Sequence, residues 1–237
     1  MDVQKLGGQL RDFLLSSDVK EYIVKIILFG SQAKKTALPH SDIDLLIVTA
    51  DGKGQERSVM DLMYDFMIDF NVPLEVMTAH INEMVVVQDY FMYNILHYGV
   101  EIYSMEKQAI KNLMIKNLLQ LCEEYLDSAK AVLAIKRLRL AIDAAYNAAE
   151  LAAKALILLK QDDLPGSHGG VVSLLGQLYI KTNELEKEIG RTLNMALKLR
   201  NEARYRPDAV LSQENAQLVL ELAEQLINFA ANKMSAL

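Results

Sequence analysis

Short apolar runs alternate with stretches of helical spacing in the N-terminal part of the chain. The apolar runs have strand length and are rich in β-branched and aromatic residues, and the stretches between them are amphipathic. Residues 43–49 are apolar almost throughout, which is typical of a strand buried on both faces. Pro73 favours an edge position, or the start of a strand, for the next run. The pattern predicts helices at 6–15, 55–69 and 83–96, and strands at 22–29, 43–49, 72–78 and 100–103.

Beyond residue 104 the strand pattern ends, and apolar residues recur every three or four positions. A proline and three glycines in residues 164–170 interrupt this helical pattern. Ser212, with Glu214 just inside the helix that follows, is a signal for a helix N-terminus. The predicted helices are 107–136, 137–160, 171–179, 184–204 and 212–234.

The change of pattern at residue 104 predicts two domains. Residues 1–104 are expected to form a small α/β (α+β) domain with a mixed sheet, and residues 105–237 an all-α, up-and-down helical bundle. With 51% apolar and 24% charged residues, the composition excludes a disordered or low-complexity chain. The single cysteine, Cys122, excludes an intrachain disulfide and a cysteine-based zinc cluster, and its place among leucines predicts an inert buried thiol.

The charge is uneven along the chain, with a net charge of −7 in residues 1–104 and +1 in residues 105–237. Neither part has the basic surface that tight, sequence-independent nucleic-acid binding needs, so nucleic acid is not an expected partner. The acidic part fits plain solubility, which charge alone favours, or carboxylates that bind metal. The N-terminal residues lack the features of a signal peptide, and every stretch of 18 residues contains a charge. We therefore expect a cytoplasmic protein without a membrane span.

Candidate chemistry lies between the first two predicted strands. Gly30 and Ser31 directly follow a strand, and a glycine there lets backbone N–H groups approach a phosphate closely. Asp42 and Asp44 are two residues apart on the next strand, so both carboxylates lie on one face, about 6.6 Å apart along the chain. Neighbouring carboxylates repel unless a cation lies between them, and their hard oxygens suit Mg²⁺. This arrangement is what metal-assisted nucleotidyl transfer requires.

Glu75 is a charged residue inside the apolar run of the third predicted strand. Such a residue is costly to bury unless it is paired or binds metal. It either points to solvent from an edge strand or joins the two aspartates as a third carboxylate. Beside the aspartate pair, we favour the second interpretation.

Residues 28–48, LFGSQAKKTALPHSDIDLLIV, resemble the signature of the minimal nucleotidyltransferases of the DNA polymerase beta superfamily. That signature is Gly-Ser, nine residues, and Ser-Asp-x-Asp after a strand, with a third acid on a later strand. The sequence departs from it at Lys34-Lys35, where relatives often have Arg-Gly, although both lysines can neutralise triphosphate charge. The resemblance implies Mg²⁺ and catalysis at Asp42, Asp44 and Glu75, and a nucleoside triphosphate at Gly30, Ser31, Lys34, Lys35 and Ser41.

Residues 167–180 and 184–210 resemble a HEPN domain, the helical module often paired with minimal nucleotidyltransferases. HEPN ribonucleases use an arginine followed, after four to six residues, by a histidine, at a helix end that meets its copy across a dimer. Tyr205 stands where the histidine is expected, and a phenol with a pKa of about 10 is a poor general base near neutral pH. The candidate residues of a HEPN site are Arg200, Asn201, Arg204 and Tyr205, with a solvated basic helix end as an equal alternative.

Together the resemblances imply Mg²⁺-dependent transfer of a nucleoside monophosphate, AMP foremost, from a nucleoside triphosphate to a hydroxyl of a small molecule or protein. The layout is also similar to that of aminoglycoside nucleotidyltransferases, in which the helical domain helps bind the acceptor across a dimer, so a homodimer is expected. In two-gene relatives the nucleotidyltransferase adenylylates a HEPN toxin, which makes self-modification near Tyr205 a hypothesis. The alternatives are a nucleotide-binding module of toxin–antitoxin type without turnover, and a HEPN ribonuclease.

Four aromatic residues lie near the end of the N-terminal part, and core or interface contacts are their first interpretation. Stacking of one of them on a base is the alternative. They are Tyr90, Phe91, Tyr93 and Tyr98.

Overall fold

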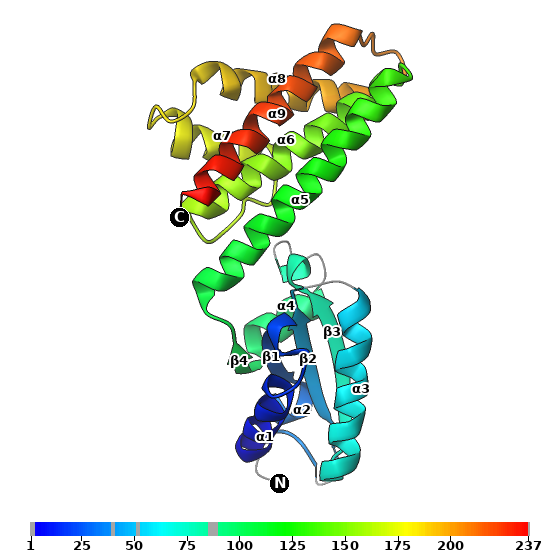
Figure 1. Cartoon of the computed structure of the whole chain (residues 1–237), viewed down its shortest axis with the longest axis vertical. Helices are drawn as coiled ribbons and strands as arrows, with labels where there is room; N and C mark the ends of the chain where they lie inside the picture. The colour runs from blue at the N-terminus through cyan, green and yellow to red at the C-terminus, as the bar shows by residue number, and fades with distance from the viewer. Residues whose placement is uncertain (1–2, 39–40, 51–52, 85–89, 237) are drawn as a thin grey trace. The chain divides into compact units, whose positions relative to one another are not determined.

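The computed structural model describes residues 3–38, 41–50, 53–84 and 90–236 of the chain. The chain divides into two compact units, Met1–Leu113 and Met114–Leu237. The first unit contains a sheet with helices and the second contains helices, as the ribbon shows (Figure 1). Among the described residues, no helix is both long and apolar enough to cross a membrane. The predicted fold class is confirmed, whereas the predicted domain boundary after residue 104 stays a prediction.

The first unit is built on a mixed sheet of four strands in the order β3-β2-β1-β4. β1 is antiparallel to both β2 and β4, and β2 is parallel to β3, which lies at an edge as Pro73 predicts. The helices are α1 (Val3–Leu15), α2 (Gly30–Ala33), α3 (Lys53–Phe70) and α4 (Tyr90–Tyr98), and the strands are β1 (Ile23–Phe29), β2 (Ile43–Thr49), β3 (Leu74–His80) and β4 (Val100–Ser104).

Helices cover the two faces of this sheet unequally. On one face, Leu28 of β1 packs in a core with Leu10 of α1 and Phe66 of α3. Successive strand residues point to opposite faces, so Ile27 lies on the other side. There Gly99, directly after α4, is so close that an added Cβ would lie 2.5 Å from Cγ2 of Ile27. The short helix α4 therefore covers part of the second face of the sheet and leaves the rest of that face uncovered by α4.

The helix predicted at 83–96 is wrong in its first part. Ile81–Met84 forms a 3-10 turn, α4 begins at Tyr90, and residues 85–89 lie outside the described residues. In the turn, the backbone N–H of His80 donates to Oε1 of Glu83 (2.8 Å), and Nδ1 of His80 accepts from the N–H of Asn82 (3.2 Å). Such local side-chain hydrogen bonds compete with helix formation, and periodicity alone does not reveal them.

The second unit is the predicted helical bundle. Its central helix α6 is rich in buried alanines and packs against α7, α8 and α9. The signal at Ser212 is confirmed as a capping box, because Ser212 and Asn215 each accept a hydrogen bond from the other's backbone. Cys122 is buried, and burial raises its pKa to about 12. The helices are α5 (Lys107–Ala134), α6 (Leu138–Lys160), α7 (His168–Leu175), α8 (Lys187–Tyr205) and α9 (Gln213–Ser235), with a π-helical turn at Gly176–Ile180.

Arg139 of α6 holds the C-terminal end of α8. Its Nη1 donates to the carbonyls of Ala203 (2.8 Å) and Arg206 (2.9 Å), and its Nη2 donates to the carbonyl of Pro207 (2.8 Å). The last carbonyls of a helix have no partner within the helix, so a guanidinium placed there satisfies several at once. The end of α8, which carries Tyr205, is thereby fixed to α6.

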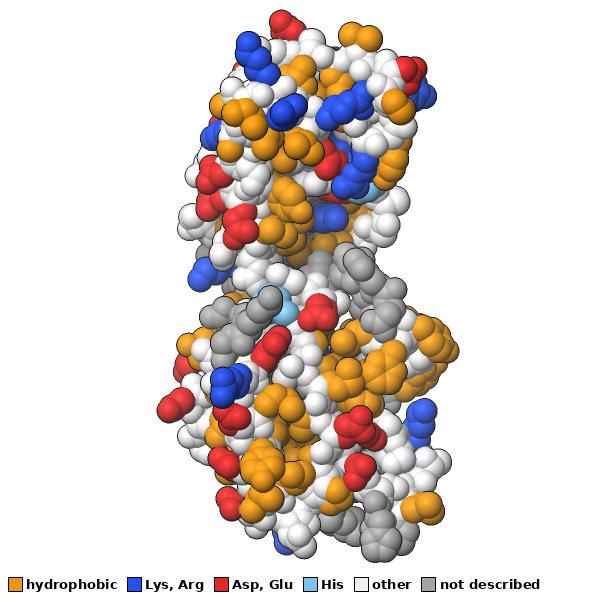
Figure 2. All heavy atoms as spheres, turned by 90° about the vertical axis from the view of Figure 1, so that its right-hand side faces the viewer, with side chains coloured by type: hydrophobic (Ala, Val, Ile, Leu, Met, Phe, Trp, Pro, Cys, Tyr) orange, Lys and Arg blue, Asp and Glu red, His pale blue; other side chains and the backbone are white. Residues whose placement is uncertain are grey.

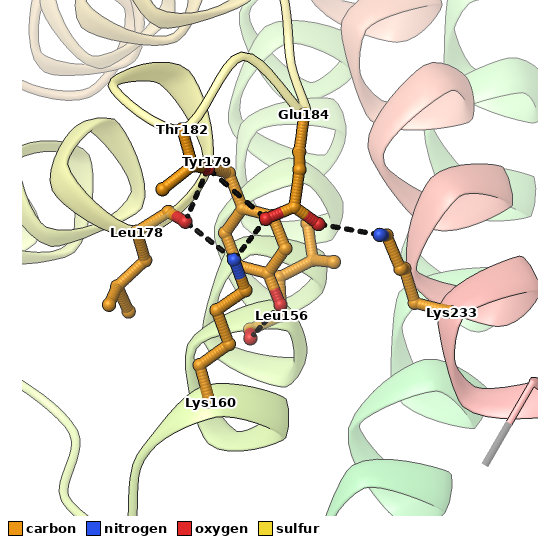
Figure 3. A network of polar contacts seen from close by, with 7 residues as sticks. All are labelled: Leu156, Lys160, Leu178, Tyr179, Thr182, Glu184 and Lys233. Carbon is orange, nitrogen blue, oxygen red and sulfur yellow. Dashed lines mark hydrogen bonds and ion pairs between the residues drawn. The ribbon is translucent and has the colours of Figure 1, made fainter.

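A polar network joins α6, α9 and the segment between the π-helical turn and α8 (Figure 3). Glu184 accepts hydrogen bonds from Nζ of Lys160 and from Nζ of Lys233 (2.5 Å). Nζ of Lys160 also donates to the carbonyl of Leu178 (2.7 Å) and lies 4.1 Å from the ring centre of Tyr179. The network therefore ties three segments together through one carboxylate.

We expect Glu184→Gln to lower the free energy of unfolding at pH 7 by about 1 kcal/mol, the upper end for partly exposed ion pairs. Hydrogen bonds from Lys160 and then Lys233 lower the pKa of Glu184 to about 2, from an ordinary value of about 4.5. A lowered pKa means that the stabilisation is complete above the ordinary value and is lost as the pH falls below it toward about 2. Urea unfolding of both proteins between pH 7 and pH 3 should show the difference shrinking below pH 4.5. Glu188→Gln, in an exposed pair with Arg191, is the control, and parallel profiles for wild type and Glu184→Gln would contradict the prediction.

Candidate functional site

A pocket of about 760 Å³ lies in the first unit, where β1 ends and β2 and β3 begin. The strand register pairs Phe29 with Asp44 across β1 and β2, and Asp44 with Glu75 across β2 and β3. The volume of the pocket falls within the range of about 300–1,000 Å³ that is usual for small-molecule sites. The lining residues are Phe29, Gly30, Ala33, Lys34, Asp44, Glu75, Tyr90, Phe91, Asn94, Ile95, Tyr98 and Gly99.

Gly30 and Asp44, predicted from the motif, are in close contact. Gly30 has a φ of +64°, in the left-handed region that disfavours residues with a side chain. A Cβ atom at this position would also overlap Oδ2 of Asp44. The backbone turn after β1 therefore touches the carboxylate of β2, and a residue with a side chain fits neither the dihedral angle nor the space.

Glu75 faces the same pocket from the neighbouring strand. It lies at the second position of the edge strand β3, directly beside Asp44, and its side chain is exposed. The two interpretations of Glu75 thus coincide, because an exposed carboxylate on an edge strand also stands next to the aspartate.

Other predicted residues of this site lie outside the pocket lining. Asp42 precedes β2 by one residue and is exposed. The hydroxyl of Ser41 accepts a hydrogen bond from the backbone N–H of Leu38 (2.8 Å), and the carbonyl of Ser31 accepts one from the backbone N–H of Thr36 (3.0 Å). Of the predicted residues, the following four therefore line the pocket: Gly30, Lys34, Asp44 and Glu75. The other predicted residues of this site do not line it.

Lys34 and Lys35 differ in their places. Lys34 lines the pocket with an exposed side chain, whereas Lys35 does not line it. Lys35 has a φ of +57°, a left-handed conformation that costs a residue with a Cβ roughly 1–2 kcal/mol. A glycine would adopt this conformation without strain. This accounts for the glycine that minimal nucleotidyltransferases often have at the position of Lys35.

The carboxylates of the pocket fit a magnesium ion in chemistry and number. Mg²⁺ is usually held by one or two carboxylates together with substrate phosphates and water, and Asp44 and Glu75 supply two. Within the described part of the chain, no group of three His, Cys, Asp or Glu side chains is arranged to hold a metal ion. A bound triphosphate would complete the ligand set.

The candidate HEPN residues of α8 divide over two faces of the helix. Arg200 and Arg204, one turn apart, both face Asp143 of α6, with nitrogen–oxygen distances of 3.3 and 3.4 Å. Asn201 and Tyr205 instead line an open depression on the outside of the bundle. Arg200 is buried, and its Nη1 donates to Oδ1 of Asn201 (3.2 Å), whereas Tyr205 is 67% exposed.

The helix α6 carries a row of polar residues that the sequence motifs do not include. Asp143, Tyr146 and Glu150 lie at intervals of three and four residues, and Oε1 of the buried Glu150 is 2.5 Å from Nδ1 of His168. Burial, followed by the charge of Glu150, raises the pKa of Tyr146. Three polar residues on one face of an alanine-rich helix are the signal that could have predicted this row, in which Tyr146 and Glu150 are buried and Asp143 is half-buried.

Two family models match the chain in succession. The nucleotidyltransferase domain model matches residues 9–120, and the HEPN domain model matches residues 115–234. The pocket with Gly30, Asp44 and Glu75 falls within the first match, and the row on α6 with the end of α8 falls within the second.

Individual relatives are distant. A protein of Methanocaldococcus jannaschii named "Putative toxin MJ0605" is 32% identical over 114 residues, which are 48% of this chain and 84% of the relative. A nucleotidyltransferase-like protein from Exiguobacterium sibiricum aligns with a TM-score of 0.42 and 10% identity, over 97% of this chain and 77% of that structure. Spectinomycin adenyltransferase AAD(9) from Enterococcus faecialis aligns with a TM-score of 0.34 and 12% identity, over 96% and 99%. Family membership rests on the two family models and the first relative: this chain belongs to the HEPN-domain family, and a nucleotidyltransferase domain precedes its HEPN domain.

Proposed function

We propose that this chain is a Mg²⁺-dependent nucleotidyltransferase that transfers a nucleoside monophosphate, AMP foremost, from a nucleoside triphosphate to a hydroxyl group and releases pyrophosphate. The observation that carries the proposal is the pocket shared by Gly30, Asp44 and Glu75, inside the segment that matches a nucleotidyltransferase domain. A backbone turn that contacts one of two carboxylates suits a triphosphate with its metal ion.

Each residue of the pocket has a proposed role. Backbone N–H groups at the turn of Gly30 and the ammonium group of Lys34 bind triphosphate oxygens. Asp44 and Glu75 hold Mg²⁺, which neutralises charge on the triphosphate when it is bound. The alternative role for the exposed Glu75 is that of the base: in place of holding the ion, it accepts the proton of the acceptor hydroxyl as the hydroxyl oxygen bonds to the α-phosphorus and the bond to pyrophosphate breaks.

The remaining motif residues flank this pocket, and we propose that they contact the nucleotide or the metal ion from its rim. Ser31 and Lys35 directly follow the lining residues Gly30 and Lys34 in the chain, and Ser41 and Asp42 are the two residues that precede β2.

The acceptor is proposed to be a hydroxyl of a small molecule or of a protein, and the assembly a homodimer. Tyr205 is 67% exposed at the end of α8, so another molecule can reach its phenol and self-modification is sterically open. The name of the Methanocaldococcus jannaschii relative supports a toxin–antitoxin setting for such a reaction.

A nucleotide-binding regulatory module without turnover would use the same pocket, so turnover separates it from the enzyme. A HEPN ribonuclease has less support. Tyr205 replaces the expected general base, and Arg200 is buried in an ion pair with Asp143 instead of facing solvent.

Thermal unfolding with ATP, CTP, GTP and UTP, each with and without Mg²⁺, tests the proposed site without a known acceptor. A nucleotide at 100 times its Kd should add about 2.7 kcal/mol to the free energy of unfolding, which corresponds to a rise of a few degrees in Tm. We expect this rise with at least one nucleotide, and we expect it to require Mg²⁺. Unchanged Tm values with all four nucleotides would contradict the proposal.

A further inference from the structure

The pocket has a second, aromatic side formed by α4. Tyr90, Phe91 and Tyr98 line it and are 79%, 53% and 64% exposed. A surface view shows hydrophobic side chains gathered on the surface of the first unit (Figure 2). Exposed aromatic side chains lose the benefit of burial, so several of them in the wall of one pocket indicate a binding surface.

Helical spacing directs these side chains into the pocket. Phe91, Asn94, Ile95 and Tyr98 follow one another at three, one and three residues, so they share one face of α4, and all four line the pocket. Tyr93 does not line it, and its ring is stacked on His97 with centres 5.4 Å apart and planes at 9°. One face of α4 is therefore turned toward Asp44 and Glu75. Tyr93 lies outside this face and stacks on Tyr90 from behind the pocket lining, with ring centres 6.4 Å apart.

The aromatic side begins directly beside the phosphate turn. The ring of Phe91 packs edge-on against Phe29, with centres 5.9 Å apart and planes at 88°. Phe29 in turn precedes Gly30 and is the register partner of Asp44. A ligand whose anionic end lies at Gly30 and Asp44 thus reaches the rings of α4 without leaving the pocket.

We infer that the wall formed by Phe91 and Tyr98 is the binding surface for the nucleobase of the triphosphate, a step that rests on the proposed function. A nucleoside triphosphate has the two matching ends, a polyanion and a flat π system. Bases stack on aromatic side chains whatever their hydrogen-bonding edge, because every base presents a π face. Asn94 lies between Phe91 and Tyr98 in the sequence and also lines the pocket. Its Nδ2 donates to the carbonyl of Tyr90 (2.8 Å), and its amide oxygen can accept a hydrogen bond from the edge of the base.

The test compares Mg·ATP with Mg·tripolyphosphate, which has the same anionic chain and no base. Isothermal titration of the chain of residues 1–237 is expected to show that wild type binds ATP at least tenfold more tightly than tripolyphosphate. Tyr98→Ala and Phe91→Leu are each expected to weaken ATP about tenfold, equivalent to about 1.4 kcal/mol, and to leave tripolyphosphate unchanged. Leucine at position 91 keeps apolar packing against Phe29 while removing the π face.

Tyr93→Ala is the matched control, because Tyr93 lies on the same helix, is 48% exposed and does not line the pocket. Its affinity for ATP should equal that of wild type. Equal affinities of wild type for ATP and tripolyphosphate would overturn the stacking inference and leave the proposed function standing. So would equal losses in Tyr98→Ala and Tyr93→Ala. A wild-type protein that binds neither ligand would overturn the proposed function, and the inference with it.

Discussion

Replacing Asp44 by asparagine is expected to lower the rate of nucleotidyl transfer about 1,000-fold while leaving the fold intact. The substitution removes one of two carboxylate charges from the pocket and keeps the shape of the side chain. Charge stabilisation by a bound metal ion contributes several kcal/mol to such reactions, and about 4 kcal/mol corresponds to three powers of ten in rate. Pyrophosphate release from Mg·ATP, with the protein itself and a set of aminoglycosides as acceptors, measures the loss.

Asp61→Asn is the control for this prediction. Asp61 is an exposed residue of α3, which covers the face of the sheet opposite α4, so this variant loses the same charge away from the pocket. Its rate should equal that of wild type, and its thermal midpoint should match that of Asp44→Asn within a few degrees. If both variants released pyrophosphate at the wild-type rate, Asp44 would have no part in the reaction.

Gly30→Ala is expected to weaken Mg·ATP binding at least 100-fold and to destabilise the first unit. The added Cβ would overlap the carboxylate of Asp44, and φ of +64° alone costs a residue with a side chain roughly 1–2 kcal/mol. Either the turn or the carboxylate has to move, so the anion site loses its geometry. We expect a loss of about 2 kcal/mol in the free energy of unfolding, measured by urea, and at least 100-fold weaker binding by titration.

Gly8→Ala gives the opposite expectation in the same unit. Gly8 lies inside α1, and an added Cβ would meet nothing within 4 Å. Alanine in place of glycine in a helix interior stabilises by roughly 0.5–1 kcal/mol. A Gly30→Ala protein that kept wild-type ATP affinity would show that the contact between Gly30 and Asp44 does not matter for the site.

The local signals of the sequence were sufficient for most of the secondary structure. The apolar run 43–49 matches β2 at both ends, because a strand buried on both faces needs apolar residues throughout. Ser212 marks the start of α9 since a cap depends on residues that are neighbours in the chain. The helix predicted at 83–96 failed in its first part because hydrogen bonds of Glu83 and His80 form a turn that periodicity does not reveal.

Contacts between distant residues needed the tertiary structure. The motif predicted that Gly30, Asp44 and Glu75 act together, but their common pocket follows from the register of three strands. The ion pair of Arg200 with Asp143 depends on which faces of α6 and α8 meet, and no spacing within either helix determines that.

The sequence by itself therefore determined two things about this protein: the order of its helices and strands, and the motif that points to nucleotidyl transfer, because both are encoded by residues close together in the chain. The tertiary structure alone decided which motif residues line the pocket and that the aromatic face of α4 forms its other side. The physical reason is that register and helix packing are set by the burial of whole faces, a property of the assembled core that no short segment carries.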